Sequence, residues 1–345
     1  MKRSRLEELT GRFPSCRVAV LGDFFLDQYL EVDPDLEERS LETGKSAHQV
    51  AAVRSSPGAA GTVANNLASL DCGRIHALGV TGDDGQGFEL RKCLDRIGCT
   101  TRGLRRRKAM LTPTYLKPRD LSRKELSGEH ERYDIRNRDP IPPDLLQEML
   151  ADLEGLLDRV DAVIIEDQVE QPDLGVVTAE VRDGLTNLAL RHPRVIFWAD
   201  SRAQIHHFRR MILKPNQFEV VRRTSPGPRE KVRVDSIRQV LPRLRSRNGA
   251  PICVTLGDAG ALVTDPEMAR VPAVRVEGPL DVTGAGDSFT AGAVLALCSR
   301  ASLPEAALVG NLAASVTIRQ LSVTGTATRR QLVSRLAHWK EQNEL

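Results

Sequence analysis

The chain has 345 residues, of which 41% are hydrophobic and 28% are charged, as expected for a globular protein with a substantial core. Its 49 basic and 46 acidic side chains leave a net charge of +3, which gives no reason to expect nucleic acid as a partner. The N-terminal segment lacks the apolar region of a signal peptide, and no stretch approaches about 18 uninterrupted apolar residues. We therefore expect a cytoplasmic protein that does not enter a membrane.

Short apolar runs alternate with longer helical patterns along the chain. The runs that we expect to be buried strands cover residues 17–23, 74–82, 161–167, 194–200, 210–216 and 251–257. The segments with helical periodicity cover residues 62–70, 88–98, 145–157 and 176–191. This alternation predicts an α/β fold with a mostly parallel sheet, in one domain over residues 1–345. Ligands of such sheets gather at the carboxyl ends of the strands, where Gly, Asp and Asn residues fall here.

Two polar segments, about residues 28–56 and 109–138, interrupt this alternation. Both contain short pieces of alternating polarity, such as YLEV, HQVAAV and TYLK, and neither contains a long amphipathic helix. They are predicted to be antiparallel strands of a small lid inserted in the core, with two surface loops as the alternative. Because unpaired strand edges seek partners, a homodimer through the lid is expected.

The stretch DVTGAGD at residues 281–287 precedes an apolar helical run, SFTAGAVLALC. Its glycines let the backbone approach a ligand, and a helix N-terminus adds partial positive charge, so the turn suits an anion such as phosphate. An acid fits beside a phosphate if it takes a proton from the group that attacks the phosphate. We therefore expect Asp287 to be a general base, the alternative being an acid that only stabilises the helix dipole.

Six motifs follow the order found in the ribokinase-like carbohydrate kinases, the phosphofructokinase B family, which the chain resembles from about residue 17 to 335. They are GDFFLD, PGAAGTVANNLASL, GDDGQG, KPNQFE, VTLGDAGALV and DVTGAGDSFTAG. Within the family, GDFFLD, TPTYLK at 112–117 and TGTAT at 324–328 are most similar to kinases of heptose 7-phosphate. The resemblance implies a three-layer α/β/α core with a small β lid, and ATP-dependent phosphorylation of a sugar or sugar phosphate.

The resemblance also implies roles for individual residues. Asp287 would take the proton of the acceptor hydroxyl, while the amides of Gly284, Ala285 and Gly286 meet the transferring phosphoryl group. The residues at the nucleotide would be Asn216, Thr255, Gly257 and Gly260 for ATP, Glu219 for Mg²⁺ through water, and Asp281 for a monovalent cation such as K⁺. The residues at the sugar would be Asp27, Gly58, Thr62, Asn66 and Lys117. The spacing of Asn216 and Glu219 also fits a helix cap, a use compatible with the first.

The sugar-binding element departs from the family pattern G-G-x-x-N, because residues 58–62 read GAAGT. Ala59 adds a methyl group and Thr62 replaces an amide by a hydroxyl, so we expect neutral sugars to bind poorly and a phosphorylated acceptor to bind better. The side chains that offer positive charge for such a phosphate are Lys117, Arg119 and the run 105–108. The family's D-Y-x-K-G string reads DQVEQ at 167–171, without its lysine, and Arg202 or Lys214 would supply positive charge instead.

Two other kinds of function stay open. A kinase of nucleosides or other small alcohols is one; a nucleoside site calls for aromatic stacking, and only 4% of the residues are aromatic, with Tyr29 and Tyr115 near the lid. A sugar- or nucleotide-binding relative without catalysis is the other, and it has no use for Asp287. The intact acid and turn therefore favour the sugar or sugar-phosphate kinase.

Overall fold

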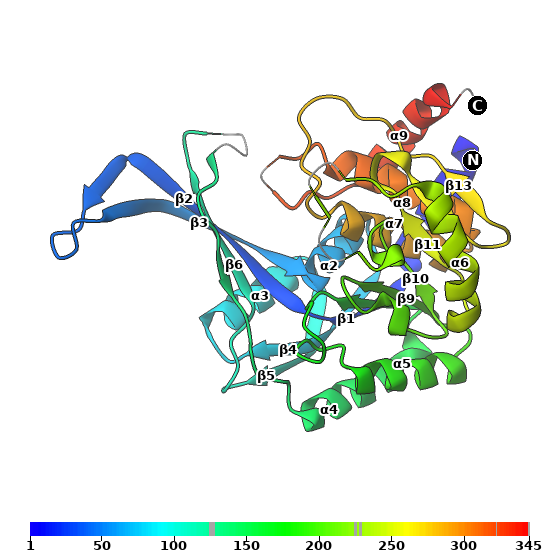
Figure 1. Ribbon diagram of the computed structural model, residues 1–345, viewed down its shortest axis with the longest axis horizontal. Coiled ribbons are helices and arrows are strands. Elements are labelled where there is room, and N and C mark those ends of the chain that lie inside the picture. The colour runs from blue at the N-terminus through cyan, green and yellow to red at the C-terminus, as the bar shows by residue number, and fades with distance from the viewer. Residues whose placement is uncertain (124–127, 224–225, 228–229, 322, 344–345) are drawn as a thin grey trace.

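The computed structural model describes residues 1–345 except 124–127, 224–225, 228–229, 322 and 344–345. Its centre is a six-stranded parallel sheet in the order β10-β9-β8-β1-β4-β5 (Figure 1). The strands are β1 (Arg17–Gly22), β4 (Arg74–Gly82), β5 (Cys99–Arg107), β8 (Ala162–Asp167), β9 (Ile196–Ser201) and β10 (Ile212–Leu213). A parallel bridge from Leu213 to Ile252 leads to a three-stranded antiparallel sheet of β11 (Cys253–Thr255), β12 (Ala261–Val263) and β13 (Ala269–Val271).

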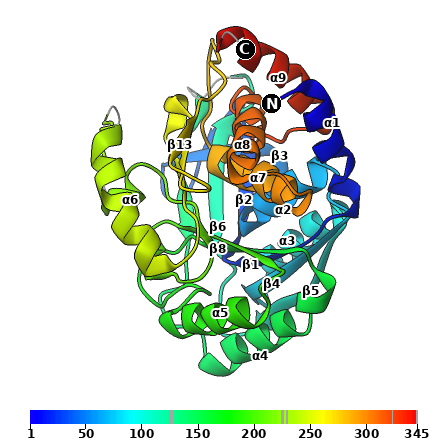
Figure 2. The same cartoon turned by 90° about the vertical axis from the view of Figure 1, so that its right-hand side faces the viewer.

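Successive side chains of the central strands enter two different cores, because a strand points them to opposite faces. In β1, Val18 and Val20 belong to one core, whereas Ala19 and Leu21 belong to the other. The helices of the first core are α1 (Arg3–Gly11), α2 (Ala60–Ser69), α3 (Gly85–Arg96), α7 (Ala285–Cys298), α8 (Leu303–Thr317) and α9 (Arg329–Gln342). Those of the second are α4 (Pro143–Glu154), α5 (Ala179–Arg191) and α6 (Val234–Asn248). Figure 2 shows the two groups on either side of the sheet, so the expected three-layer α/β/α fold is confirmed.

Several helices begin at a residue whose side chain caps the first turn. Asp84 accepts a hydrogen bond from the amide of Gly87 at the start of α3, and Thr178 does the same for α5. Ser302 forms a capping box at the start of α8. In contrast, α7 follows Gly284, which has no side chain to cap the helix, so the N-terminus of α7 can meet a ligand instead.

Both polar segments contribute strands to a separate four-stranded sheet, β3-β2-β6-β7. In it, β2 (Phe24–Arg39) and β3 (Ser46–Ala59) form a long antiparallel hairpin that extends away from the body of the molecule (Figure 1). Strand β6 (Thr114–Asp120) runs parallel to β2, where an antiparallel neighbour was expected, because the chain returns to β2 through the core instead of through a hairpin. Strand β7 (Tyr133–Ile135) pairs antiparallel with β6.

Residues 124–127 of the expected lid segment 109–138 lie outside the described part of the chain. Within the described part, no helix has the length and apolar character needed to cross a membrane.

Candidate active site

A cavity of about 900 Å³ lies between the carboxyl ends of the core strands, the N-terminus of α7 and the base of the β2–β3–β6–β7 sheet. The expected site residues that line it are Asp27, Thr62, Lys117, Asn216, Glu219, Thr255, Gly257, Gly260, Gly284, Ala285, Gly286 and Asp287. Gly58, Asn66 and Asp281 do not line it. We call core end the part lined by Asp200, Lys214, Asn216, Glu219 and residues 284–287, and lid end the part lined by Asp27, Tyr115, Lys117, Arg132 and Arg136.

The start of α7 is shaped by glycines. Gly284 has a φ of 75°, a left-handed conformation that favours glycine. A methyl group at Gly286 would lie 3.3 Å from Nζ of Lys214, so this glycine leaves room for the lysine beside the helix. The amide of Ala285 donates to the carbonyl oxygen of Val282 at 3.1 Å. Of the three amides expected to meet an anion, that of Ala285 is therefore already engaged within the turn.

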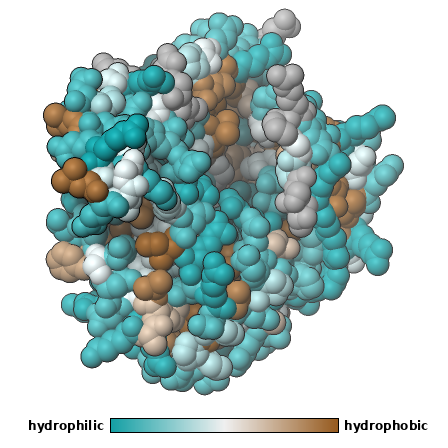
Figure 3. Space-filling view, turned by 60° about the vertical axis from the view of Figure 1, so that its left-hand side comes forward, coloured by the Kyte–Doolittle hydropathy of each residue, from teal (hydrophilic) through white to brown (hydrophobic). Residues whose placement is uncertain are grey.

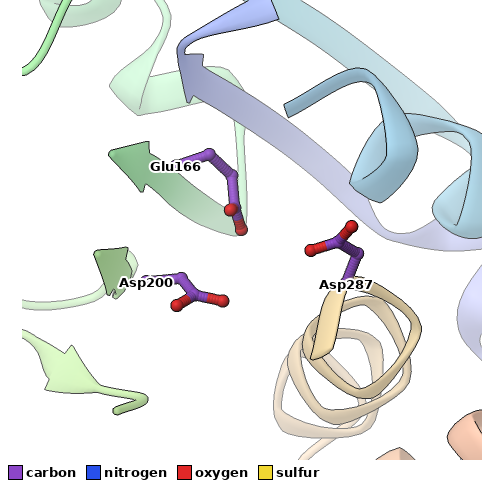
Figure 4. A group of neighbouring side chains, drawn as sticks. All are labelled: Glu166, Asp200 and Asp287. Carbon is purple, nitrogen blue, oxygen red and sulfur yellow. The ribbon is translucent and has the colours of Figure 1, made fainter. Parts of the chain in front are cut away.

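Three carboxyl groups converge beside the start of α7: those of Glu166, Asp200 and Asp287 (Figure 4). One oxygen of each lies within 4.8 Å of an oxygen of the other two. Burial, and after it the charge of Asp200, raises the pKa of Asp287 to about 7. An acid with this pKa can accept a proton near neutral pH, which is what a general base must do.

Lys214 supplies positive charge among these acids. Its Nζ lies 2.6 Å from Oδ2 of Asp200, and its side chain is only 5% exposed. Burial lowers the pKa of Lys214, but the charges of Asp200 and Glu219 outweigh this effect and leave the pKa raised, so the lysine is charged. One lysine does not balance Asp200, Glu219 and Asp287 when all three are ionised. This oxygen-rich, negative end of the cavity fits a hard cation such as Mg²⁺.

Asn216 and Glu219 form the reciprocal cap that their spacing allows. The amides of Phe218 and Glu219 donate to Oδ1 of Asn216 at 2.8 and 2.9 Å. The amide and Nδ2 of Asn216 each donate to one carboxylate oxygen of Glu219, both at 2.7 Å. Burial, and after it the charge of Asp200, raises the pKa of Glu219 to about 7. Because both side chains also line the cavity, the cap leaves them able to face the water shell of a cation.

The other residues expected at the nucleotide and the cation have structural tasks as well. Thr255 forms a parallel bridge with Asn216, which fixes the two segments side by side. Gly260 has a φ of 92°, and a methyl group there would lie 2.1 Å from the carbonyl oxygen of Val271. Asp281 is buried, and its Oδ1 accepts a hydrogen bond from the amide two residues later, at 3.0 Å, in the turn that leads into α7.

Asp27 is the acid of the lid end. Its Oδ2 lies 3.1 Å from Nζ of Lys117, whereas its Oδ1 is buried and has no hydrogen-bond partner among the described residues. A methyl group at Gly58 would lie 3.0 Å from this Oδ1. The absence of a side chain at Gly58 therefore leaves room for the carboxyl group of Asp27. A buried carboxylate oxygen without a donor is unfavourable, and the hydroxyl of a ligand would satisfy it.

The start of α2 forms another part of the wall. Ala59, directly before the helix, has a φ of 53°, in the region that favours glycine. Thr62 donates from Oγ1 to the carbonyl oxygen of Pro57 at 3.4 Å. Asn66 is fully buried and donates to the carbonyl oxygens of Thr62 and Gly325, at 3.0 and 3.4 Å. Asn66 thus holds α2 against the TGTAT segment and does not touch the cavity.

Arginines gather around Tyr115 at the lid end. The guanidinium carbons of Arg132 and Arg136 lie 4.4 and 5.7 Å from the centre of its ring. Asp134, between them in the chain, pairs with both, at 2.6 and 2.9 Å. Neither arginine was expected from the sequence, although alternate positions in RYDIR at 132–136 share one face of a strand.

Of the cations that the sequence analysis named, some line the cavity and others lie outside it. Lys117, Arg202 and Lys214 line the cavity, whereas Arg119 and residues 105–108 do not. Arg119 lies two residues, roughly 7 Å, further along β6 than Lys117 and faces Glu31 at 3.6 Å. Arg105 pairs with two acids of α4 instead. Charge alone suggested Arg119 and residues 105–108, and their positions along the strands place them outside the cavity.

The chain is similar to known proteins in sequence and in fold. The family model described as pfkB family carbohydrate kinase matches residues 18–329. The bifunctional protein HldE of Sulfurimonas denitrificans is 27% identical over 319 residues, which are 90% of this chain and 62% of that protein. The protein of the same name from Helicobacter pylori is 27% identical over 313 residues, or 88% of this chain and 63% of its own length. The chain thus spans less than two thirds of the length of these relatives.

Two solved structures show the same fold. Ribokinase of Arabidopsis thaliana, complexed with ribose and ATP, gives a TM-score of 0.65 at 18% identity and covers 93% of this chain and 98% of its own. Phosphofructokinase-2 of Escherichia coli, in complex with potassium, gives a TM-score of 0.69 at 20% identity, with 94% and 99% covered.

Proposed function

Because the chain belongs to the pfkB family of carbohydrate kinases, we propose that it transfers the γ-phosphoryl group of ATP to a hydroxyl of a phosphorylated sugar. Heptose 7-phosphate is the first acceptor to test. One observation carries the proposal: a single cavity joins a half-buried acid at the start of α7 to a cluster of cations at the lid end. The acid suits the chemistry of transfer, and the cations suit a second phosphate on the acceptor.

In the proposed reaction, Asp287 accepts the proton of the acceptor hydroxyl while the oxygen of that hydroxyl forms a bond to the γ-phosphorus. The bond between the γ-phosphorus and the bridging oxygen breaks, and ADP leaves. Lys214 and the amides of Gly284 and Gly286 stabilise the negative charge on the transferring group. The amide of Ala285 takes part only if its bond to Val282 opens. Catalysis then depends mainly on position and on fixed charge.

The acceptor would lie between α2 and the lid sheet. The unpartnered Oδ1 of Asp27 would accept a hydrogen bond from a sugar hydroxyl, and Thr62 would contact the ring from α2. Lys117, Arg132 and Arg136 would hold the phosphate, for which Asp134 keeps the two arginines in place. We propose that the four-stranded sheet closes over the sugar as a lid.

ATP would occupy the part of the cavity lined by Thr255, Gly257 and Gly260. Asn216 and Glu219 would hold Mg²⁺ through water, and the ion would supply positive charge at the phosphates. Asp281 would serve a monovalent cation, as potassium accompanies the related fold of phosphofructokinase-2. Dependence of the activity on K⁺, measured against Na⁺, tests this last assignment. We place the enzyme in the cytoplasm, where ATP is formed and consumed.

A nucleoside acceptor fits the lid end less well. The ring of Tyr115, on which a base would stack, has the guanidinium carbon of Arg132 at 4.4 Å and Nζ of Lys117 at 5.9 Å from its centre. These cations would form charge-assisted hydrogen bonds with a phosphate, which are stronger than their contacts with an uncharged base.

ADP release measured over a panel of sugars, sugar phosphates and nucleosides tests the proposal, with the Asp287→Asn variant as the blank for contaminating kinases. We expect a phosphorylated sugar to have a higher kcat/KM than its unphosphorylated counterpart, and the product mass to increase by one phosphoryl group. Equal or faster turnover of neutral ribose, fructose or a nucleoside would contradict the proposed acceptor class. ADP release that also persists in the blank would contradict the proposed base.

A second copy of the chain would bind along the lid. The β2–β3 hairpin leaves the body of the molecule and carries the exposed side chains of Val50 and Val53 (Figure 1). The view in Figure 3 is mostly hydrophilic, with hydrophobic side chains in small separate patches. We therefore expect pairing of strand edges with small apolar contacts. Sedimentation of Val50→Asp/Val53→Asp should show monomers where the wild type is a dimer, whereas Leu190→Asp, an exposed residue of α5, should not change the assembly.

A further inference from the structure

Glu166 is a buried acid that the proposed reaction does not use. It lies near the end of β8, its exposed fraction is 0%, and it does not line the cavity. Its Oε2 accepts a hydrogen bond from Nε2 of Gln168 at 3.0 Å, whereas its Oε1 is buried without a partner among the described residues. Figure 4 shows its carboxyl group directed toward the space between Asp200 and Asp287. Glu166 therefore lies beside the proposed base and outside the cavity wall.

The charges that face Glu166 come from three elements. Strand β9 contributes Asp200, the register partner of Glu166; α7 contributes Asp287; and the end of β10 contributes Lys214. Lys214 already pairs with Asp200 at 2.6 Å. Strand β1 also packs beside β8, and Asp23 follows it. The carboxylate of Asp23 is engaged by backbone amides of the loop after β8, from which it accepts hydrogen bonds. Two acids thus face Glu166 directly, and the nearby lysine is bound to one of them.

A third ionised carboxylate at this place is unfavourable. Burial, and after it the charges of Asp200 and Asp287, raises the pKa of Glu166 well above its ordinary value. An ionised Glu166 would leave Oε1 as a buried acceptor without a donor. If Oε1 of Glu166 carries a proton, its O–H group can donate a hydrogen bond, and the carboxylates of Asp200 and Asp287 can accept it. One proton on Glu166 therefore resolves the unpaired oxygen and the repulsion together.

We propose that Glu166 carries a proton in the resting enzyme and donates it in a hydrogen bond, directly or through one water, to the carboxylate of Asp287. This bond keeps Asp287 ionised and oriented toward the acceptor hydroxyl. The inference rests on the proposed function of Asp287 as the base. Glu166 is a positioning residue: it acts through Asp287, touches neither substrate, and keeps its own proton during turnover.

Two substitutions separate this role from a structural one. Glu166→Gln keeps the shape and can donate from Nε2 as the protonated acid does, whereas Glu166→Ala removes the donor. We expect kcat/KM of Glu166→Gln to stay within about threefold of wild type and the acid limb of its pH profile to stay in place. In Glu166→Ala, Asp287 loses a donor to its charged form, so the acid limb should move up by about one pH unit and turnover at pH 6 should fall about tenfold. Glu180→Gln, on the surface of α5, is the matched control.

Three results would overturn the inference. The acid limb of Glu166→Gln moves down, which means that a negative charge has been removed. Glu166→Gln loses as much activity as Glu166→Ala. Or Glu166→Gln needs a higher Mg²⁺ concentration for half-maximal rate, which means that the three acids hold a cation.

A spectroscopic readout does not depend on activity. The infrared difference between wild type and Glu166→Gln at pH 7 should contain the carbonyl stretch of a protonated carboxyl group, and its absence overturns the inference. If that band is present but no acceptor in the panel is phosphorylated, the proposed function fails while the protonation of Glu166 stands.

Discussion

The two ends of the cavity are built in different ways. At the core end, Glu219 and Asp287 are half-buried, and Lys214 contacts Asp200 at 2.6 Å, with side chains that are 5% and 9% exposed. At the lid end, the side chains of Arg132 and Arg136 are 50% and 48% exposed and are held by one short strand and Asp134. A fixed, desolvated end suits a reaction whose geometry does not vary. A half-exposed end with long side chains suits recognition that tightens when the acceptor binds.

The largest effect is expected from the core end. Asp287→Asn should leave the fold and ATP binding intact and lower turnover by roughly 10²-fold to 10⁴-fold, the scale of losing a general base. Asp183→Asn, an acid of α5 that does not line the cavity, is the matched control and should change turnover little. Turnover of Asp287→Asn within a few-fold of wild type would mean that another group removes the proton.

The same substitution should stabilise the protein, because the core end holds acids that burial disfavours. The pKa of Asp287 rises from 3.8 to about 7 on folding, so this one group makes the folded state less stable as pH rises from about 4 through about 7, and its contribution is constant below and above that window. The free energy of unfolding of Asp287→Asn should therefore exceed that of wild type at pH 8 by about 2 kcal/mol, after allowing for burial of the amide. Urea titrations at pH 4 and pH 8 measure it; an advantage that is equal at both values would refute the raised pKa.

A smaller and more selective effect is expected at the lid end. Arg132→Ala/Arg136→Ala should lower kcat/KM for a phosphorylated acceptor about 10-fold to 30-fold, since the lost charge-assisted bonds are partly screened by water. The unphosphorylated sugar should be nearly unaffected, and added salt should reduce the advantage of the phosphorylated one. Arg106→Ala/Arg107→Ala, which removes exposed cations outside the cavity, is the control. Equal losses with both sugars would show that the arginines support the lid and not the phosphate.

The same contrast explains what the sequence could predict. The core end is encoded in short segments: DVTGAGD contains both the turn and the acid, KPNQFE contains Lys214, Asn216 and Glu219, and Asp200 comes at the end of an apolar run. The positions of such residues can be predicted from the sequence, because the carboxyl ends of parallel strands meet at one edge of the sheet. The lid end depends on the pairing of β6 with β2, which lies far away in the chain, and on the pairing of β7 with β6. The sequence shows which side chains are charged but not how these strands pair. The prediction therefore included Arg119 and residues 105–108, which lie outside the cavity, and missed Arg132 and Arg136, which line it.

The smallest effect concerns the wall between the two ends. Ala59 has a φ of 53°, where a side chain is strained, so Ala59→Gly should raise the free energy of unfolding by about 0.5 to 1 kcal/mol, the relief being partly offset by backbone entropy. Ala60→Gly, at the first position of α2, should not stabilise the protein, because its backbone is helical. With Thr62→Asn added, Ala59→Gly should also broaden acceptance toward neutral sugars. A loss of stability in Ala59→Gly would contradict the strain.

A crystal structure with a non-hydrolysable ATP analogue and heptose 7-phosphate tests the division between the two ends most directly. The account predicts that the sugar phosphate contacts Arg132 and Arg136 while one sugar hydroxyl lies within about 3 Å of a carboxylate oxygen of Asp287, in line with the γ-phosphorus. A phosphate bound away from both arginines, or a nearest hydroxyl beyond hydrogen-bond reach of Asp287 in the closed complex, would contradict it.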